Sequence, residues 1–125
     1  MLGHGSDLLR TIEAKTASYY MTYQDNAKII TNRAASGAVT LTLPPTADLW
    51  AGWWVEAFNC VLAQNLIVAS NAVDTLSTFN DLTADSVALQ TASERAGGGF
   101  RFVWDGTGWL VQMFTEETQT VTIVT

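Results

Sequence analysis

The sequence predicts an all-β fold, an antiparallel β-sandwich or jelly-roll-like domain with a short N-terminal arm. Short stretches in which apolar and polar residues alternate recur along the chain. Prolines, glycines and Asn or Asp residues separate these stretches at fairly even spacing, as in sandwiches and barrels. After residue 17 no stretch shows the long apolar period of a packed helix. A closed barrel made of the same strands is the alternative architecture.

The first 17 residues differ from the rest of the chain. Ser6 or Asp7 can cap a short helix that carries Leu8, Leu9 and Ile12. One or two helical turns are only marginally stable alone in water. We therefore expect residues 1–17 to form an arm that becomes ordered on another chain, and residues 18–125 to form the sandwich. A frayed terminus is the alternative for the arm.

The first half of the domain contains three expected strands, at residues 19–24, 28–33 and 39–43. The last of these alternates most clearly, with Val39, Leu41 and Leu43 predicted to point inward and the threonines outward. Pro44 and Pro45 end it, because proline cannot donate a hydrogen bond to a neighbouring strand. Residues 46–52 predict a loop or one helical turn.

Further strands are expected at residues 53–60, 66–70, 75–79, 86–90 and 120–124, and a hairpin at residues 100–114. The hairpin turn contains Asp105, which can accept hydrogen bonds from its own turn, and Gly106, which tolerates a positive φ. Outside the turn, Arg101 and Gln112 are the only polar residues of the hairpin. A strand pair with one solvated face should be polar at every second position. Both faces of the hairpin are therefore expected to be covered, one by the sandwich and one by another chain.

The composition also predicts contacts between chains. Charged residues make up only 14% of the chain, against about 25% in ordinary soluble domains. Hydrophobic residues make up 48%, with five tryptophans. No apolar run approaches the ~20 residues of a membrane-spanning helix. The excess of apolar surface therefore favours a subunit of a protein assembly, with a monomer that has a large core as the alternative.

The charge distribution disfavours nucleic acid and anionic membranes as partners. The net charge is -6, and no Lys or Arg occurs between Ala34 and Ser93. Binding to nucleic acid needs a dense basic patch, and anionic lipid surfaces attract basic segments. Neither feature is present in the sequence.

Catalytic and metal-binding motifs are missing from the sequence. His4 is the only histidine and Cys60 the only cysteine. Nucleophilic hydrolase sites and zinc sites need more of these residues than the chain has. Cys60 is expected to be a small apolar residue within a sheet. We therefore expect no enzyme activity, no cofactor, and no catalytic, cofactor-binding or metal-binding residues.

The tryptophans are the remaining candidates for function, as a sugar-stacking platform or as the centre of a protein interface. Trp53 and Trp54 are adjacent in an expected strand, so their side chains must point to opposite faces. Tryptophan is enriched in the energetic centres of interfaces. The predicted oligomer interface consists of Trp53, Trp54, Phe100, Phe102, Trp104 and Trp109.

The order of four segments in the chain resembles a β-domain of bacteriophage virion proteins. The segments are TNRAASGAVTLTLP, then WWVEAFNC after Gly52, then QNLIVAS, and last GGGFRFVWDGTGW. The resemblance covers roughly residues 30–114, and the two tryptophans after Gly52 depart from the usual pattern. The positions that carry it are Thr42-Leu43-Pro44, Gly52, Asn59, Asn65-Leu66, Val68, Val103, Asp105-Gly106-Thr107 and Trp109.

The resemblance implies a β-sandwich or jelly-roll domain that is usually trimeric and has no catalytic residues. Such domains occur in capsid decoration (cement) proteins, head fibres and tail fibres. We therefore expect a structural virion protein on the capsid surface, which binds the major capsid protein as a homotrimer and stabilises the capsid. Its capsid-binding arm would contain Leu8, Leu9, Arg10 and Ile12. The alternative is a tail-fibre or carbohydrate-binding module that recognises host surface glycans.

Overall fold

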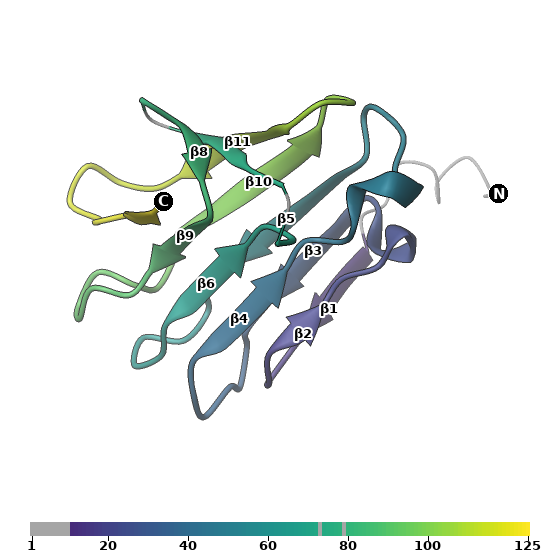
Figure 1. Cartoon of the computed structure of the whole chain (residues 1–125). Helices are drawn as coiled ribbons and strands as arrows, with labels where there is room; N and C mark the ends of the chain where they lie inside the picture. Colours follow the sequence, from purple (N-terminus) through teal and green to yellow (C-terminus); the bar gives the residue numbers. More distant parts are fainter. Residues whose placement is uncertain (1–10, 73, 79) are drawn as a thin grey trace, which may run out of the picture.

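The protein is a β-sandwich of two sheets, as the sequence predicts. The computed structural model describes residues 11–72, 74–78 and 80–125. In this part of the chain, twelve strands form a seven-stranded and a five-stranded sheet. Figure 1 shows β9, β6, β4 and β2 side by side in one layer, with β10, β5 and β3 in the layer behind.

The strands of the seven-stranded sheet are, in spatial order, β1 (Thr11–Ala14), β3 (Lys28–Thr31), β5 (Trp54–Phe58), β10 (Gly99–Trp104), β11 (Trp109–Phe114), β7 (Leu76–Thr78) and β8 (Asp81–Ala84). Those of the five-stranded sheet are β12 (Thr122–Val124), β9 (Ser86–Leu89), β6 (Leu66–Ala69), β4 (Val39–Thr42) and β2 (Tyr19–Tyr20). Two 3-10 turns, η1 (Tyr23–Asp25) and η2 (Thr46–Asp48), connect strands in the first half.

The expected antiparallel pairing was wrong for the first six strands. From β1 to β6 the chain alternates between the two sheets, so β1, β3 and β5 lie in one and β2, β4 and β6 in the other. Each strand therefore runs parallel to the next strand of its own sheet. In the second half, β10 pairs antiparallel with both β5 and β11, whereas β11 pairs in parallel with β7. Period-2 alternation marks the faces of a strand but not the direction of its neighbours.

The expectation of a helix near the N-terminus was wrong for its described part. Thr11–Ala14 forms β1, which pairs in parallel with β3 at the edge of the seven-stranded sheet. Ile12 pairs with Ile29, and Lys15 continues the pairing through a hydrogen bond from its N–H to the carbonyl of Thr31 (2.8 Å). Pairing with β3 supplies main-chain hydrogen bonds to these residues, whereas a helix of one or two turns is only marginally stable. Residues 11–14 therefore belong to the domain.

The core lies between the two sheets and follows the predicted alternation where the strands are long. Val39, Leu41 and Leu43 are buried, as expected for inward positions. The seven-stranded sheet contributes the largest buried side chains, Trp53 and Trp109, whose rings meet edge to face with centroids 5.7 Å apart. Such aromatic pairs add about 1 kcal/mol beyond the burial of their surface.

The turn between β10 and β11 has the predicted chemistry. The Asp105 carboxylate accepts hydrogen bonds from the main-chain N–H groups of Thr107 (2.8 Å) and Gly108 (2.7 Å). These bonds, the one from Gly108 first, lower the pKa of Asp105 below its ordinary value. Gly106 has φ of 97°, a conformation that glycine adopts without strain. The hairpin is thereby fixed in register.

A buried pair of amide side chains joins the ends of β3 and β5. Asn32 Nδ2 donates to Asn59 Oδ1 (3.0 Å), and both residues are fully buried. Asn59 also holds the loop after β5, because its Oδ1 accepts from Val61 N–H (2.9 Å) and its Nδ2 donates to Gln64 O (3.1 Å). Cys60 lies just past β5 and is half-buried, so its expected place inside a strand was wrong.

Candidate interaction surface

The seven-stranded sheet has a second face, which points away from the five-stranded sheet. We call it the outer face and define it by ten residues whose neighbours in sequence point inward: Ile12, Ile29, Trp54, Glu56, Phe58, Arg101, Val103, Leu110, Gln112 and Phe114. The strand register places them in rows across the sheet. One row runs from Ile12 through Ile29, Glu56 and Arg101 to Gln112.

Two further rows make most of the outer face apolar. Trp54, Val103 and Leu110 are aligned across β5, β10 and β11. Phe58 and Phe114 flank Gly99 in the same way. Leu110 is 48% exposed, Phe114 37% and Ile12 66%, whereas Trp54, Phe58 and Val103 are half-buried. The row of Glu56, Arg101 and Gln112 lies between these two apolar rows. Exposed apolar side chains gathered in this way are typical of protein interfaces.

A charged pair lies in the middle of this apolar face. Arg101 donates to Glu56 Oε2 through Nε (2.7 Å) and Nη2 (2.5 Å). The guanidinium carbon of Arg101 lies 5.6 Å from the centre of the Trp54 ring and 5.5 Å from that of Phe114. Aromatic rings attract a cation over their faces, by ~0.5–2 kcal/mol for each ring depending on exposure.

The outer face has no net charge. Glu56 and Arg101 are the only charged residues among its ten, and their charges cancel. The chain as a whole has a net charge of -6, which therefore lies elsewhere. Two copies of this face can approach without repulsion between like charges, which is the electrostatic condition for association of a chain with itself.

Five of the six residues predicted for the oligomer interface lie in the core of the single chain. Trp53, Phe100, Phe102 and Trp109 are fully buried between the sheets, and Trp104 is 7% exposed. Their assignment to a surface between chains was wrong, because the alternation of β10, of β11 and of the residues that lead into β5 points them toward the second sheet. Trp54 is the one that lies on the outer face.

The outer face contains residues that the sequence analysis did not single out as interface residues, namely Val103, Leu110 and Phe114. The available signal was the alternation itself. Trp53 and Phe102 are large and aromatic, so their partners one position away, Trp54 and Val103, mark the opposite face. Choosing the interface by residue size selected the core instead.

Of the four residues named for capsid binding in the arm, Ile12 is the one that the structure describes. It lies on β1 at the edge of the outer face, next to Ile29, and is exposed. Leu8, Leu9 and Arg10, and also His4, lie outside the described residues.

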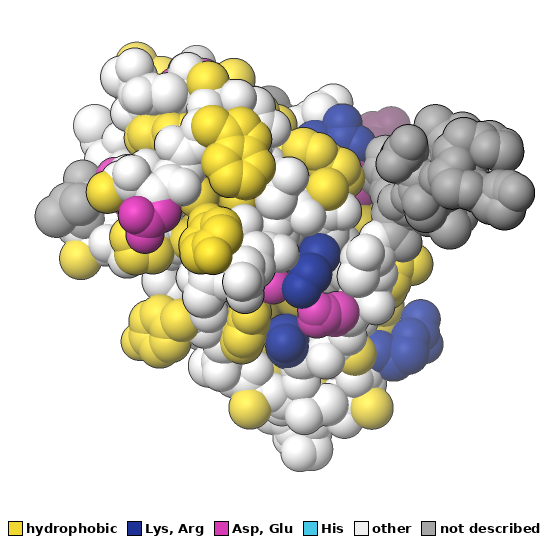
Figure 2. Space-filling model, turned by 90° about the vertical axis from the view of Figure 1, so that its right-hand side faces the viewer, with side chains coloured by type: hydrophobic (Ala, Val, Ile, Leu, Met, Phe, Trp, Pro, Cys, Tyr) yellow, Lys and Arg dark blue, Asp and Glu magenta, His cyan; other side chains and the backbone are white. Residues whose placement is uncertain are grey.

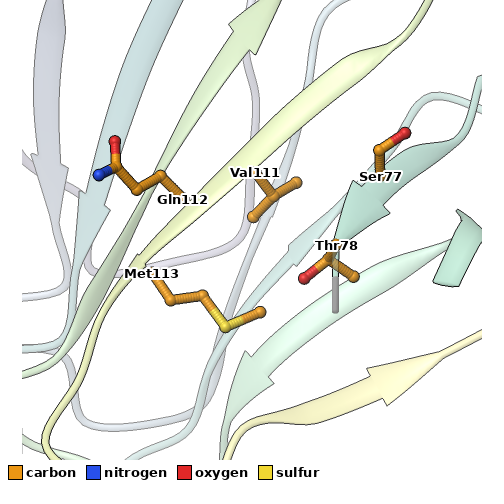
Figure 3. Close-up of a pocket in the computed structure, with 5 residues that line it drawn as sticks. All are labelled: Ser77, Thr78, Val111, Gln112 and Met113. Atoms are coloured by element: carbon orange, nitrogen blue, oxygen red, sulfur yellow. The ribbon is translucent and has the colours of Figure 1, made fainter. Parts of the chain in front are cut away.

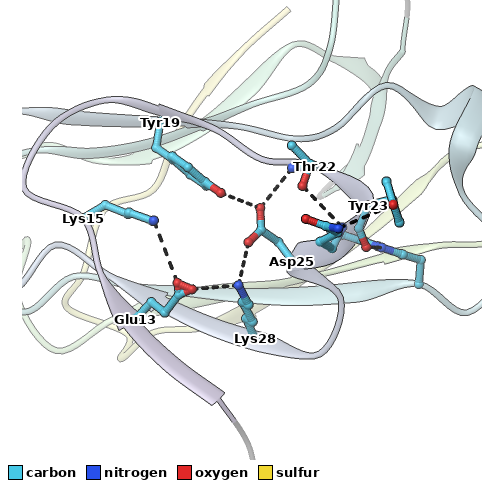
Figure 4. A network of polar contacts seen from close by, with 9 residues as sticks. Glu13, Lys15, Tyr19, Thr22, Tyr23, Asp25 and Lys28 are labelled. Atoms are coloured by element: carbon cyan, nitrogen blue, oxygen red, sulfur yellow. Dashed lines mark hydrogen bonds and ion pairs between the residues drawn. The ribbon is translucent and has the colours of Figure 1, made fainter.

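A polar network closes the edge of the sandwich next to β1 and β2 (Figure 4). Lys28 Nζ lies between Glu13 Oε1 (2.7 Å) and Asp25 Oδ1 (3.0 Å). The other carboxylate oxygen of Asp25 accepts from Tyr19 Oη (2.9 Å) and from Thr22 N–H (2.9 Å). Figure 2, viewed from this side, shows acidic and basic side chains in one group with hydrophobic side chains around them.

The network sets the ionisation of its members. Burial alone would raise the pKa of Asp25, but the hydrogen bonds from Thr22, Lys28 and Tyr19 outweigh it and hold the pKa below its ordinary value of 3.8. Hydrogen bonds to Glu13 and then to Asp25 raise the pKa of Lys28. Burial and the bond to Asp25 raise the pKa of Tyr19. These shifts favour a charged Asp25 and a charged Lys28 at neutral pH. The network ties β1 and β2 to η1 and β3.

Within the residues that the structure describes, no three His, Cys, Asp or Glu side chains lie close enough together to hold a metal ion. The same part of the chain has no helix with the length and hydropathy that a membrane-spanning helix requires.

No protein-family model matches the sequence, and no curated protein matches it significantly. The outer face, with its exposed apolar side chains and the Arg101–Glu56 pair, is the candidate site on which we base the function.

Proposed function

We propose that the protein is a structural subunit of an assembly, in which copies of the chain pack through the outer face of the seven-stranded sheet. One observation carries this proposal: large apolar side chains cover a sheet face whose only charges, on Arg101 and Glu56, neutralise each other. Such a face gains free energy when it is removed from water, at roughly 25 cal/mol per Å² of apolar surface. A second copy offers a surface of the same character.

The resemblance to bacteriophage virion β-domains indicates what kind of assembly this would be. We propose a homotrimer that binds the surface of a capsid and stabilises it, as decoration (cement) proteins do. Three identical subunits attach with a high effective concentration, so weak individual contacts add up to firm binding. The partner is then the major capsid protein and the location is the virion.

Capsid binding is tested by deleting residues 1–10. The deletion must stop there, because Thr11–Ala14 pairs with β3 and Glu13 bonds to Lys28. We expect the shortened chain to fold and self-associate but no longer to co-sediment with capsids at a fixed ratio. If it still decorates capsids as the full chain does, the expected role of the arm is wrong.

Glycan recognition is the second candidate, favoured by two exposed aromatic side chains beside Trp53. Trp53 N–H donates to the carbonyl of Trp50 (3.1 Å), and Trp53 Nε1 donates to that of Tyr23 (2.9 Å). Trp50 and Tyr23 are both about half exposed. A saturable change in tryptophan fluorescence on titration with a glycan, lost in Trp50→Ala, would support this role.

A further inference from the structure

Strand β1 is attached to the domain without adding a side chain to its core. Thr11, Ile12 and Ala14 are exposed, and Glu13 is only partly buried. Its neighbour β3, in contrast, places Ile30 fully in the core. A segment with few buried apolar contacts opens at a low free energy while the rest of the protein stays folded. β1 can therefore leave β3 without removing a side chain from the core.

The opposite edge of the same sheet does not have this property. There, Leu76 of β7 and Ala84 of β8 are fully buried. A cavity of about 510 Å³ lies beside them, and its described lining is Ser77, Thr78, Val111, Gln112 and Met113. Figure 3 shows Val111 and Met113 on one side of this opening and Thr78 on the other. Detachment of β7 and β8 would remove buried side chains from the core, so β1 is the edge strand that can open alone.

The main-chain bonds between β1 and β3 form one discrete set. Lys15 N–H donates to the carbonyl of Thr31 (2.8 Å). Alternate residues of a strand direct their N–H and C=O groups to the same side. In the register of the two strands, the N–H groups of Glu13, Ile29 and Thr31 therefore lie in the same interface, whereas that of Ile30 points toward β5. Opening of β1 exposes the first set together and leaves Ile30 protected.

Glu13 provides the side-chain contact that holds β1 against the domain. Its Oε1 lies 2.7 Å from Lys28 Nζ, which also binds Asp25 Oδ1 at 3.0 Å (Figure 4). Because Asp25 is only 2% exposed, it keeps the Lys28 ammonium in place beside Glu13. Lys15 follows β1 and lies 3.9 Å from the other oxygen of Glu13 and 3.8 Å from the centre of the Tyr19 ring.

We propose that residues 11–15 form a strap, a segment that detaches from β3 as a unit while the sandwich stays folded, and that the Glu13–Lys28 ion pair holds it in place. Thr16, Ala17 and Ser18 are exposed, and Ser18 Oγ accepts a hydrogen bond from Thr40 N–H (3.1 Å). Opening therefore frees the chain as far as residue 17. These seven residues span about 23 Å when extended.

The strap would set the reach of the N-terminal arm. If residues 1–10 bind the capsid, opening extends their reach by the length of the freed segment, and closing shortens it. This consequence rests on the proposed function, whereas the opening of the strap does not.

Hydrogen exchange of the full chain in low concentrations of urea tests the opening. We expect the amides of Glu13, Lys15, Ile29 and Thr31 to exchange at least about a hundredfold faster than that of Ile30. Their rates should not change in low urea, because a local opening exposes little surface. Equal protection of all five amides, with the same dependence on urea, overturns the proposal, since β1 would then open only with the whole domain.

Glu13→Gln tests the ion pair. We expect the amides of Lys15, Ile29 and Thr31 to exchange about three- to tenfold faster in this variant, with that of Ile30 unchanged. Glu117→Gln, at an exposed carboxylate, is the control and should change none of these rates. Unchanged exchange in Glu13→Gln, or an equal rise at Ile30, overturns the role of the ion pair.

A disulfide between register partners tests the reach of the arm. Ile12→Cys and Ile29→Cys, combined with Cys60→Ala, join the strap to β3 when oxidised, and the reduced form of the same protein is the matched control. We expect the oxidised form to bind capsids at least about threefold more weakly than the reduced form. Equal binding overturns the role of the strap in capsid attachment. Absence of binding by both forms overturns the proposed capsid function, and the exchange rates then decide the strap alone.

Discussion

Arg101 makes polar and aromatic contacts that connect several side chains of the outer face. Its guanidinium binds Glu56 through two N–H groups and lies near the rings of Trp54 and Phe114. These contacts hold a long, flexible side chain in one conformation against the sheet. The planar guanidinium of arginine can make these contacts together. The ammonium group of lysine cannot, because it lacks the fork of N–H donors. Arg101 thus organises the side chains around it.

Replacing Arg101 by alanine removes both hydrogen bonds and both ring contacts. We expect the free energy of unfolding in urea to fall by about 1–3 kcal/mol. Arg101→Lys should recover less than half of this loss, because lysine cannot reproduce the bidentate geometry. Arg33→Ala, at an exposed arginine, is the control and should change stability by less than about 0.5 kcal/mol. Equal effects at the two positions would contradict the role assigned to Arg101.

Asp25 makes the stability of the edge network depend on pH. Its pKa in the folded protein lies below the unfolded value, so the folded state favours the ionised form. A group with a lowered pKa stabilises the fold above its unfolded pKa of about 4, and this contribution is lost as the pH falls from there through the folded value.

The Asp25→Asn variant tests this dependence. We expect it to unfold more easily than the unchanged protein at pH 7, by about 1–3 kcal/mol, because a neutral amide forms weaker bonds with Lys28 and Tyr19. The difference between the two proteins should shrink below about pH 4 as the native carboxylate takes up its proton. The exposed Asp48→Asn is the control. A difference that stays constant from pH 7 to pH 2 in thermal unfolding would show that ionisation of Asp25 is not the cause.

At the scale of elements, the close approach of β5 and β10 depends on Gly99. A methyl group on Gly99 would lie 2.4 Å from the carbonyl oxygen of Ala57 and 2.9 Å from the Phe58 ring. The first of these atoms belongs to the main chain of a central strand and cannot move without opening the sheet. The same absence of a side chain leaves room for Phe58 and Phe114 on either side of Gly99.

Gly99→Ala should therefore destabilise the protein by about 1–3 kcal/mol, the range seen when a packed site is overfilled. Gly108→Ala is the matched control, since a methyl group there meets nothing within 4 Å and its φ is not positive. Urea unfolding followed by tryptophan fluorescence measures both variants. Equal midpoints would mean that β5 and β10 adjust to the added group.

The sequence predicts the elements well where a strand is long or its turn has a clear signature. The hairpin around Asp105 has both, and residues 39–43 show clear alternation and end at two prolines, so the expected strands lie there. β8 was missed although its four residues, DLTA, alternate between polar and apolar, because the segment is short and Ala84 is its only buried residue. The expected strand over residues 19–24 is only two residues long, since the side chains of Thr22 and Asp25 cap a 3-10 turn. Local hydrogen bonds of this kind compete with strand pairing.

At the scale of the whole molecule, the parallel winding of β1 to β6 could not be predicted from the sequence. Each strand there pairs with one two positions away along the chain, so the pairing depends on contacts distant in sequence. The same limit applies to the candidate site. Large residues indicate burial. Which face of a strand is buried against the second sheet, and which is left on the surface, depends on where that second sheet packs. This is why the core aromatics were assigned to the interface.

The most direct test of the proposed function is the mass of the protein in solution, measured by light scattering at micromolar concentration. The account predicts a trimer, with three times the 13.6 kDa of one chain. Leu110→Lys adds an unpaired charge to the outer face, whereas Leu62→Lys alters a more exposed leucine in the loop after β5. We expect the first variant to be a monomer and the second to remain a trimer. A monomeric unchanged protein, or a trimer that survives Leu110→Lys, would contradict association through this face.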